Sequence, residues 1–372
     1  MKIAFLMRMI HPSAGQTHDI SEIIKYLLLK HPECEISIFT PKIYYPLVEG
    51  MDDKKIRIYK VNQYYRAMIF RRKLAYKLKD YDIIYIKGNY PYVFPAIKSG
   101  RPTVLVVHQM DSVKLFKGIL TKLRLIATNV ITEYTLKKPT VVVTVSEELA
   151  SFYKKKYGIN AYVIGDQISD TYYNTKVRIS PNQRDDLRLL TVGNWDGHNG
   201  RKRQDVLLHY FAESIKILPN LKLTLVGLSA DNLRHLDHLC VKLNLNSSTT
   251  LKGHISEQDL LEEYLNNHIY VTATTYEGFY RQIVEGFATG MPAVVYDARD
   301  FVGDVSGAAS TNHVIKSSAG ETFIDPASFT NSLIKVLNNY EVYSARAKEY
   351  AKQFSEQALG VKTWDLLEKI IH

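Results

Sequence analysis

The sequence is poor in cysteine and shows no cysteine pattern. Of its 372 residues only Cys34 and Cys240 are cysteines, and their positions do not show the spacing of a zinc site. This usage predicts reduced thiols, as in a cytoplasmic protein, and excludes a disulfide scaffold.

Long apolar runs are also missing. No run reaches the roughly 18 residues that a membrane-spanning helix needs. The first residues, MKIAFLMRMIHP, form a short apolar run that is broken by Arg8 and lacks a small-residue cleavage site. We therefore expect a first β-strand there and not a signal peptide.

Two familiar phosphate-binding motifs are absent. The loop after the first predicted strand is not a G-x-G-x-x-G, which argues against a nicotinamide cofactor, and the chain has no G-x-x-x-x-G-K-[ST]. Nor does it contain a recognised nucleic-acid module. We expect no resident cofactor and no metal.

Acidic residues are scarce in the first half of the chain. Residues 1–170 carry a formal charge of +12, whereas residues 171–372 carry −2. This asymmetry indicates an anionic partner for the first half, either membrane or nucleic acid. Residues 64–79 and 112–131 interleave basic with large apolar side chains. They predict either two amphipathic helices packed on the first domain or a surface that meets anionic lipid, and the charge asymmetry favours lipid.

Short apolar runs alternate with amphipathic helical stretches, and this happens twice. Examples are KIAFLM, TVLVVH, LRLLTVG and IYVTAT, and the long helical stretch at 326–354 follows the last of them. Such alternation predicts parallel sheets covered on both faces, in two doubly wound domains that face a central cleft. The polar stretch 166–186 has few core candidates and is the predicted hinge. We expect domains at 1–170 and 171–355, with a helix at 356–372 that packs back toward the first domain.

Two carboxylates stand out in YEGFYRQIVEGFATGMP, which begins at Tyr276. We expect a helix from near Phe279, so that Glu277 lies at the carboxyl end of the preceding strand and Glu285 lies about two turns into the helix. The free N–H groups of the first turn, from Gly278 to Arg281, can bind an anion such as a diphosphate. Taken alone, either glutamate is equally well explained as a solvated charge.

The surrounding residues carry a family resemblance. The stretch VTATTYEGFYRQIVEGFATGMPAVV resembles the E-x7-E signature of family 4 retaining glycosyltransferases. Further stretches are similar to other parts of that family in the right order: HPSAGQTHDISEIIKYLLLKHPECEISIFTP, PTVLVVHQMDS, VVVTVSEELASFYKKKYGINAYVIGDQISD, LLTVGNWDGHNGRKRQDVLLHYFAESIKILPNLKLTLVG and LKGHISEQDLLEEYLNNHIYVTATTYEG. The resemblance implies the GT-B fold, two Rossmann-like domains with the acceptor held mainly by the first and the nucleotide sugar mainly by the second.

The resemblance also implies roles for residues of the second domain. Glu285 would bind the nucleotide ribose and Glu277 the transferred sugar. Lys202 would neutralise the leaving diphosphate, which a fixed cation can do without a metal. The remaining donor-binding residues implied here are Gly193, Arg203, Gly278, Phe279 and Tyr280.

Two residues of the first domain are implied as well. His108 ends the strand TVLVVH and would lie near the donor sugar, with Asp111 close by. It is a candidate catalytic residue without being assigned as a general base. Gly15, in the loop after the first strand, would let the backbone approach the diphosphate.

The chain departs from the family pattern at three positions. Asn194 stands where an arginine is common, and Arg201 or Arg203 are the candidates to replace it. Tyr280 stands where glycine is common, so we expect a reshaped sugar or acceptor pocket. Gly286 replaces the usual alanine.

These observations predict a metal-independent, retaining hexosyltransferase that uses a UDP-, GDP- or other nucleotide-diphosphate sugar. The expected acceptor is a glycan or lipid-linked hydroxyl, and the expected location is cytoplasmic, peripheral on the inner face of a membrane. The alternatives are a sugar-nucleotide-binding protein with little or no transferase activity, and a sugar-nucleotide epimerase. Fold alone does not choose between these.

Overall fold

The structure is a computed structural model of the whole chain. It describes residues 1–11, 15–44, 54–61, 71–88, 90–108, 119–175, 180–181, 186–195, 197, 200–299 and 309–372. The chain divides into two compact units. The N-terminal unit comprises Met1–Ile168 together with Phe354–His372, and the C-terminal unit comprises Ser169–Gln353.

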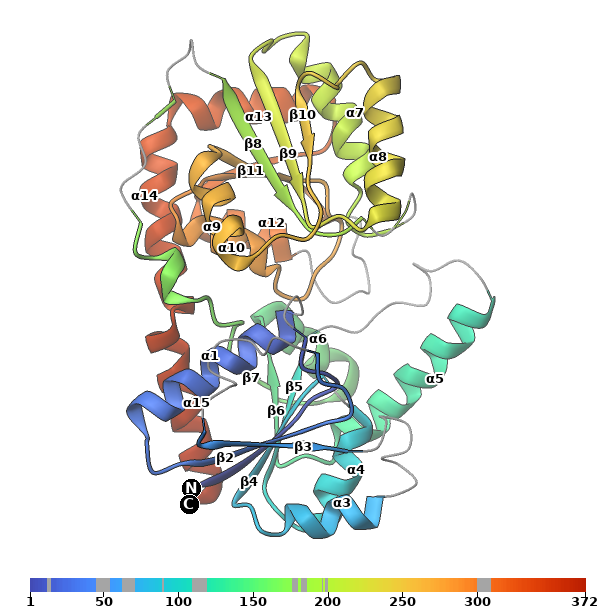
Figure 1. Cartoon of the computed structure of the whole chain (residues 1–372), viewed down its shortest axis with the longest axis vertical. Coiled ribbons are helices and arrows are strands. Elements are labelled where there is room, and N and C mark those ends of the chain that lie inside the picture. Colours follow the sequence, from blue (N-terminus) through green and yellow to red (C-terminus); the bar gives the residue numbers. More distant parts are fainter. Residues whose placement is uncertain are drawn as a thin grey trace. The chain divides into compact units, whose positions relative to one another are not determined.

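A parallel sheet forms the centre of the N-terminal unit (Figure 1). Its described strands pair in the order β3-β2-β1-β4-β5-β6-β7. In chain order they are β1 (Lys2–Leu6), β2 (Glu35–Thr40), β3 (Ile56–Lys60), β4 (Ile83–Lys87), β5 (Thr103–Val107), β6 (Val141–Thr144) and β7 (Tyr162–Val163). Every residue of β4 and β5 is buried, as expected for strands covered on both faces. The strand order reverses between β1 and β4, and ligands bind such sheets outside the carboxyl ends at this switch point.

Helices and one short 3₁₀ turn complete the N-terminal unit. They are α1 (Gly15–Lys30), α3 (Arg71–Leu78), η1 (Tyr90–Tyr92), α4 (Val93–Ser99), α5 (Ile119–Leu136), α6 (Glu147–Tyr157) and the C-terminal helix α15 (Glu356–Ile371). α15 packs against α1 (Figure 1). Gly360 faces the Tyr26 ring at this contact, and Trp364 stacks on His31 with ring centroids 3.4 Å apart.

The C-terminal unit contains a second parallel sheet, with described strands in the order β10-β9-β8-β11-β12-β13. The strands are β8 (Leu187–Val192), β9 (Leu221–Val226), β10 (Thr249–Leu251), β11 (Ile269–Thr272), β12 (Ala293–Tyr296) and β13 (Gly320–Phe323). Here the order reverses between β8 and β11. The edge strand β13 was not expected from the sequence, because its first three residues are only partly buried and give no apolar run.

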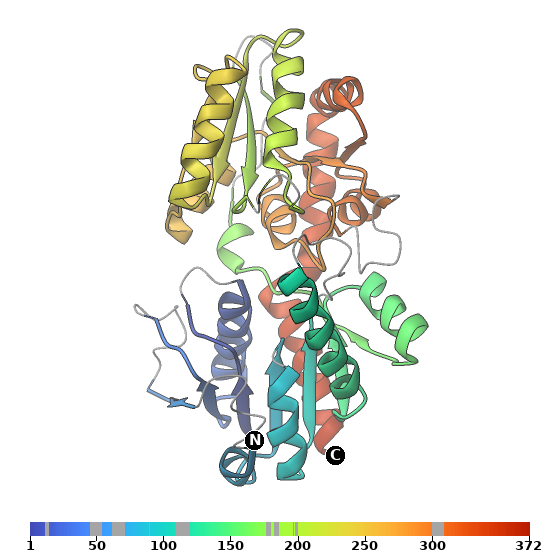
Figure 2. The same cartoon turned by 90° about the vertical axis from the view of Figure 1, so that its right-hand side faces the viewer.

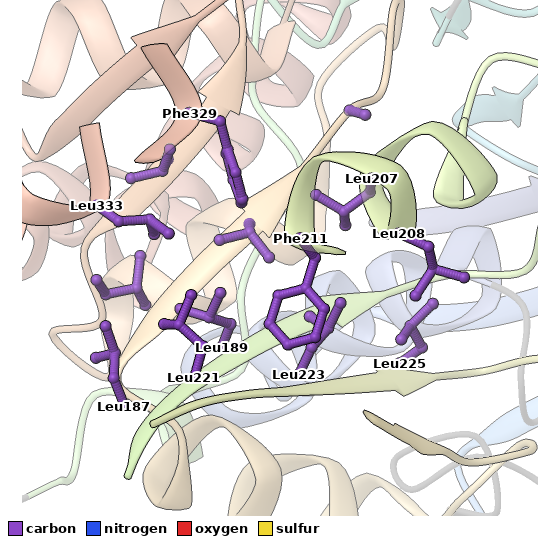
Figure 3. Close-up of a cluster of buried hydrophobic side chains, with 14 of the residues drawn as sticks. Leu187, Leu189, Leu207, Leu208, Phe211, Leu221, Leu223, Leu225, Phe329 and Leu333 are labelled. Carbon is purple, nitrogen blue, oxygen red and sulfur yellow. The ribbon is translucent and has the colours of Figure 1, made fainter. Parts of the chain in front are cut away.

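The helices of this unit contribute side chains to its hydrophobic core. They are η3 (Asp170–Tyr172), α7 (Gln204–Ile215), α8 (Ala230–Lys242), α9 (Glu257–Asn266), α10 (Arg281–Ala288), α12 (Ala309–Ser317), α13 (Pro326–Asn338) and α14 (Tyr340–Ala351), and the 3₁₀ turn η4 (Lys352–Phe354) follows. α7 contacts α8 and α13 (Figure 1, Figure 2). Figure 3 shows leucines of β8 and β9 packed beneath Phe211 of α7, beside Phe329 of α13.

Two expectations about elements are wrong in detail. The helical stretch 326–354 is not one helix, because Asn339 leaves helical geometry (φ −129°, ψ 27°) and separates α13 from α14. The polar stretch 166–186 does contribute to the core: Asp166, Gln167 and Tyr172 are all buried. The Asp166 carboxylate enters the interior there because it pairs with Lys87, and the backbone N–H of Gln167 donates to Asp19.

The predicted fold class is confirmed at the level of architecture: each unit is a parallel sheet, and described helices lie between most of its successive strands. Cys34 and Cys240 are buried and free. Within the described residues, no helix combines the length and the apolar character needed to span a membrane.

Replacing Gly360 with alanine should destabilise the N-terminal unit. In a helix interior alanine is favoured over glycine by ~0.8–1.0 kcal/mol, so propensity alone predicts a gain. A Cβ atom at Gly360 would however overlap the Tyr26 ring, and such overpacking costs about 1–3 kcal/mol. Urea denaturation followed by Trp364 fluorescence, in a Trp195→Phe background, should show a lower midpoint. Val361→Ala, at an exposed position of the same helix, serves as the control; a higher midpoint for Gly360→Ala would show that α1 and α15 do not pack this closely.

Candidate functional site

Two loops meet at the switch point of the C-terminal unit. One follows β8 and contains Gly193 and Lys202, and the other follows β11 and contains Glu277. The backbone N–H of Thr275 donates to the carbonyl of Arg201 at 2.8 Å, which ties the two loops together. Gly193 has φ 138°, a conformation that favours glycine, and a Cβ atom at this position would lie 3.5 Å from Nζ of Lys202. The loop after β8 therefore folds back over its own start.

Glu277 is held between two cations. Its Oε1 lies 2.6 Å from Nζ of Lys202, and its Oε2 lies 3.2 Å from Nη1 of Arg201. The Lys202 and Glu277 side chains are 10% and 13% exposed. Pairing in such a semi-buried place offsets the cost of removing the charges from water. We call Arg201, Lys202, Glu277 and Tyr280 the Glu277 cluster.

The ring of Tyr280 packs against Lys202 of this cluster. Nζ of Lys202 lies over its ring at 4.5 Å from the centroid, a cation–π arrangement. The ring is 3% exposed and its hydroxyl lies 2.8 Å from Oγ1 of Thr272, within a group of buried hydroxyls that includes Tyr270 and Thr274. Burial, followed by the charge and hydrogen bond of Tyr280, raises the pKa of Tyr270. The bulk of Tyr280 is thus accommodated inside the C-terminal unit.

The backbone at Tyr280 is strained. Its φ of 65° is in the left-handed region, which costs a non-glycine residue about 1–3 kcal/mol. This residue caps α10, which begins at Arg281 and not near Phe279 as expected. The buried hydroxyl and the ring contact compensate for the strain. Because α10 starts late, Glu285 lies little more than one turn from its start.

Glu285 is buried in α10 and already bonded to the protein. Its Oε1 lies 2.7 Å from Nε of Arg281, and its Oε2 accepts a hydrogen bond of 3.0 Å from Tyr264. Burial first, and then the charge of Glu285, raise the pKa of Tyr264 well above its usual value. A carboxylate has about four acceptor positions, so these two contacts do not use its full capacity to accept hydrogen bonds.

The loop before α10 is fixed by a histidine that the sequence analysis missed. His313, in α12, is buried, and its Nε2 lies 2.5 Å from the carbonyl oxygen of Phe279. Because a carbonyl only accepts, Nε2 carries the proton, and Nδ1 accepts from the hydroxyl of Tyr350 at 2.9 Å. This contact orders the loop that contains Gly278 and Phe279. No motif surrounds His313, so the sequence held no signal for it.

The departures at Asn194 and the neighbouring arginines have structural explanations. The Asn194 side-chain oxygen accepts from the Ser229 N–H at 2.9 Å and from Asn232 at 2.7 Å, at the start of α8. Arg203 lies over the Tyr296 ring, 4.9 Å from its centroid. Of the two arginines considered, Arg201 is therefore the one that contacts Glu277.

A second charged group lies at the carboxyl ends of β4 and β5 in the N-terminal unit. Lys87, the last residue of β4, is 1% exposed and forms ion pairs with Asp19 of α1 and Asp166. Nδ1 of His108, directly after β5, lies 3.5 Å from Oδ1 of Asp166. We call Asp19, Lys87, His108 and Asp166 the His108 cluster.

Of these four residues the sequence analysis found only His108. Gly15 is the first residue of α1 and does not lie in the loop as expected, while Asp111 lies outside the described residues. Within the described part of the chain, no group of three or more His, Cys, Asp or Glu side chains has a metal-binding arrangement.

Comparison with known protein families finds a different family match for each unit. The family described as Glycosyltransferase Family 4 matches residues 28–165, and the one described as Glycosyl transferases group 1 matches residues 173–354. A curated relative is the GtfA subunit of a UDP-N-acetylglucosamine–peptide N-acetylglucosaminyltransferase from Streptococcus parasanguinis. It is 34% identical over 96 residues, which span 26% of this chain and only 18% of the relative.

Solved structures match over nearly the whole chain. HepE from Anabaena, in complex with UDP and glucose, has a TM-score of 0.72 and 16% identity, covering 99% of this chain and 100% of that one. The pneumococcal O-GlcNAc transferase GtfA, in complex with UDP and GlcNAc, has a TM-score of 0.71 and 11% identity, covering 100% and 99%. WaaG, a glycosyltransferase involved in lipopolysaccharide biosynthesis, has a TM-score of 0.71 and 16% identity, covering 98% and 99%.

At these sequence identities the similar structures support the fold alone, and the matches to glycosyltransferase families support the type of reaction. One glycosyltransferase family covers most of the N-terminal unit and another covers nearly all of the C-terminal unit. The architecture is that of the matched GT-B enzymes. The chain is therefore a glycosyltransferase of the GT-B type.

Proposed function

We propose that the protein is a retaining, metal-independent hexosyltransferase that moves a sugar from a nucleotide-diphosphate donor to a hydroxyl of a lipid-linked or glycan acceptor. The observation that carries this proposal is the Glu277 cluster, which lies at the β8/β11 switch point. A cation and a carboxylate adjoin there, beside the loop that precedes α10. Such a site offers positive charge to a diphosphate and a hydrogen-bond acceptor to sugar hydroxyls.

The chemistry needs charge where the donor breaks. When the bond between the anomeric carbon and the phosphate oxygen breaks, negative charge develops on the diphosphate, and Lys202 stabilises it. The acceptor oxygen forms its bond to the same face of the anomeric carbon, which retains the configuration. The acceptor proton passes to the departing phosphate oxygen, so no separate protein base is required. Glu277 holds the sugar beside this carbon.

The donor nucleotide proposed first is a uridine diphosphate. Two of the similar structures, HepE and the pneumococcal GtfA, were solved with UDP. Calorimetry with UDP, GDP and ADP tests this choice directly. When this protein is incubated with the corresponding sugar nucleotide, it should release the nucleoside diphosphate. Proton NMR of the released or transferred sugar should show the donor's anomeric configuration. Binding without release would instead favour a sugar-nucleotide-binding protein, and inversion would exclude retention.

Lys202→Ala should lower turnover far more than stability. Loss of one fixed charge-stabilising donor costs about 2.7–4 kcal/mol of transition-state stabilisation, or roughly 10²- to 10³-fold in turnover. Glu277 would keep its contact with Arg201, so the melting temperature should change little. Lys216→Ala is the matched control, because Lys216 pairs with Glu213 in the same region of the chain but is 67% exposed. Turnover of Lys202→Ala within a few-fold of wild type would remove this lysine from the mechanism.

Glu285→Gln and Glu277→Gln should separate nucleotide binding from sugar transfer. The first should weaken the affinity for the free nucleoside diphosphate, because the ribose loses a charged acceptor. The second should leave that affinity near wild type and reduce transfer, because Glu277 is proposed to contact the sugar. Calorimetry and product release measure the two effects. Glu263→Gln, which removes an equivalent ion pair with Lys252, is the control; equal loss of nucleotide affinity in both test variants would contradict the division of roles.

The acceptor side of the proposal rests on α5. Its large apolar side chains at spacings of three and four are 47–76% exposed, so they line one face of the helix. They are Ile119, Leu123, Ile126, Val130 and Tyr134. Lys137 and Lys138 are exposed at the end of the same helix, and Figure 1 shows α5 extending beyond the sheet of its unit. Apolar side chains with adjoining cations suit the surface of an anionic membrane.

The two basic segments differ in structure. In α3, Leu74 and Leu78 are buried while Arg72 and Lys73 are exposed, so the described part of 64–79 is an amphipathic helix packed on its unit. The alternative prediction was that both segments are amphipathic helices whose apolar side chains belong to the core. For Ile119 and Leu123 of α5 this alternative is wrong, because both side chains are exposed. Phe70 and Phe116 lie outside the described residues. We therefore propose that α5 provides the apolar contact with lipid and α3 adds basic charge.

The protein should float with anionic liposomes and not with neutral ones. Each exposed Lys or Arg near an anionic bilayer contributes about 1 kcal/mol, decaying within a Debye length, so salt should weaken binding. Replacing Leu123 and Val130 by serine should reduce flotation at all salt concentrations, and replacing Arg72 and Lys73 by serine should reduce it at low salt. Ile217→Ser, at an exposed position of the C-terminal unit, is the control. Absence of flotation at low salt, or a stable dimer that the α5 variant dissociates, would turn the proposal toward a soluble acceptor.

A further inference from the structure

The chain leaves the N-terminal unit and returns to it at one place. Ile168 is the last residue of this unit before the C-terminal unit begins, and Phe354 is the first residue after the C-terminal unit ends. The backbone N–H of Ile168 donates to the carbonyl of Phe354 at 2.9 Å, and Ile168 pairs with Ser355 in a parallel bridge. The segment that ends at Ile168 is therefore joined, within the N-terminal unit, to the start of helix α15.

A small cavity lies beside this junction. Its volume is about 10 Å³, and its polar lining residues are Gln167, Thr363 of α15, Asp19 and Lys87. Apolar side chains of α1, β4, β5 and α15 complete the wall. Every lining residue belongs to the N-terminal unit, so the shape of the cavity is set within that unit.

Two of the polar side chains in this wall are almost fully buried. Gln167 and Thr363 are each 1% exposed. Among the described residues, neither Oε1 nor Nε2 of the Gln167 amide has a hydrogen-bond partner, and the same is true of Oγ1 of Thr363. Buried polar groups without a partner are unfavourable, and proteins nearly always pair them with another protein group or with an ordered water.

The size and the polarity of the cavity both fit one water molecule. A cavity needs roughly 10–15 Å³, and about two to four polar partners, to hold a single water. A water donates and accepts, so it can bond to the hydroxyl of Thr363 and to the amide of Gln167, whichever end of the amide faces it. A purely apolar cavity would stay dry, but Asp19 and Lys87 add charge to this one.

We propose that this cavity is a binding site for one ordered water, which bridges the Gln167 amide and the Thr363 hydroxyl. The water attaches the segment that ends at Ile168 to helix α15, in addition to the backbone contact between Ile168 and Phe354. The departing and the returning segments of the chain are thereby fixed to each other at two points. This water site lies within the N-terminal unit and does not depend on the donor or the acceptor proposed above.

High-resolution crystallography of the full chain tests the site directly. In the wild type we expect one ordered water within hydrogen-bond distance of the side chains of both Gln167 and Thr363. Thr363→Val keeps the shape of the side chain but removes its hydroxyl, so the density of this water should weaken or disappear. A direct hydrogen bond between Gln167 and Thr363, a cavity without water density, or a water that contacts only one of the two would overturn the proposal.

The sign of a stability change provides a second test. If the Thr363 hydroxyl bonds to the water, Thr363→Val should lower the midpoint of urea unfolding, followed by Trp364 fluorescence in a Trp195→Phe background. If the hydroxyl has no partner, Thr363→Val should leave the midpoint unchanged or raise it, because an unsatisfied polar group is replaced by a methyl group. That second result would contradict the water bridge.

A double-mutant cycle tests whether a single water serves both side chains. Gln167→Met removes the amide, and its effect on the midpoint should be smaller in a Thr363→Val background than in the wild type, because either substitution already breaks the bridge. Thr135→Val is the control, since the buried Thr135 hydroxyl donates to the carbonyl of Ile131 at 2.8 Å and should add independently to Gln167→Met. Additive effects of Gln167→Met and Thr363→Val would show that the two side chains share no water.

Discussion

The carboxylate of Glu277, held by Lys202 on one oxygen and Arg201 on the other, is the interaction on which the C-terminal site depends. It joins the loop after β8 to the loop after β11, and those two strands flank the point where the strand order reverses. Because parallel strands present their carboxyl ends at one edge of the sheet, residues 76 positions apart meet there without any long excursion of the chain. The arrangement of this site is thus a consequence of topology, and the ion pairs fix its geometry.

Tyr280 shows how the strain at this site is balanced. A left-handed tyrosine is unfavourable by itself, yet this residue is fixed by a buried hydroxyl group and by the cation above its ring. Glycine would adopt the backbone conformation without strain but would provide neither contact. The tyrosine therefore has a strained backbone, but its ring contacts Lys202. It also delays the start of α10, which places the first free amides of that helix after the residues expected from its apolar periodicity.

Local patterns in the sequence were enough to predict the parallel strands of both units, with the exception of β13, and to single out His108, Lys202, Glu277 and Glu285. These residues either end apolar strands or fall in a motif of fixed spacing. Asp19, Lys87 and Asp166 could not be found in this way. Lys87 is one more basic residue of a basic half, and its partners come from a helix and from a segment 79 positions later. Their charges are paired only in three dimensions, so a sequence reading takes them for solvated side chains.

Each unit places a semi-buried or buried lysine at its switch point, and the two lysines differ in what they can do. Lys87 is almost fully enclosed and pairs with two carboxylates, so removing Lys87 would leave two buried carboxylates without this cation. Such a residue is suited to hold other groups in place. Lys202 is more exposed, and the carboxylate it contacts also binds Arg201. If Lys202 turned toward an incoming diphosphate, Glu277 would keep a cationic partner and Lys202 would gain an anionic one. The exchange replaces one ion pair by another in the same low-dielectric surroundings, and it is therefore a smaller change in free energy than breaking a pair outright.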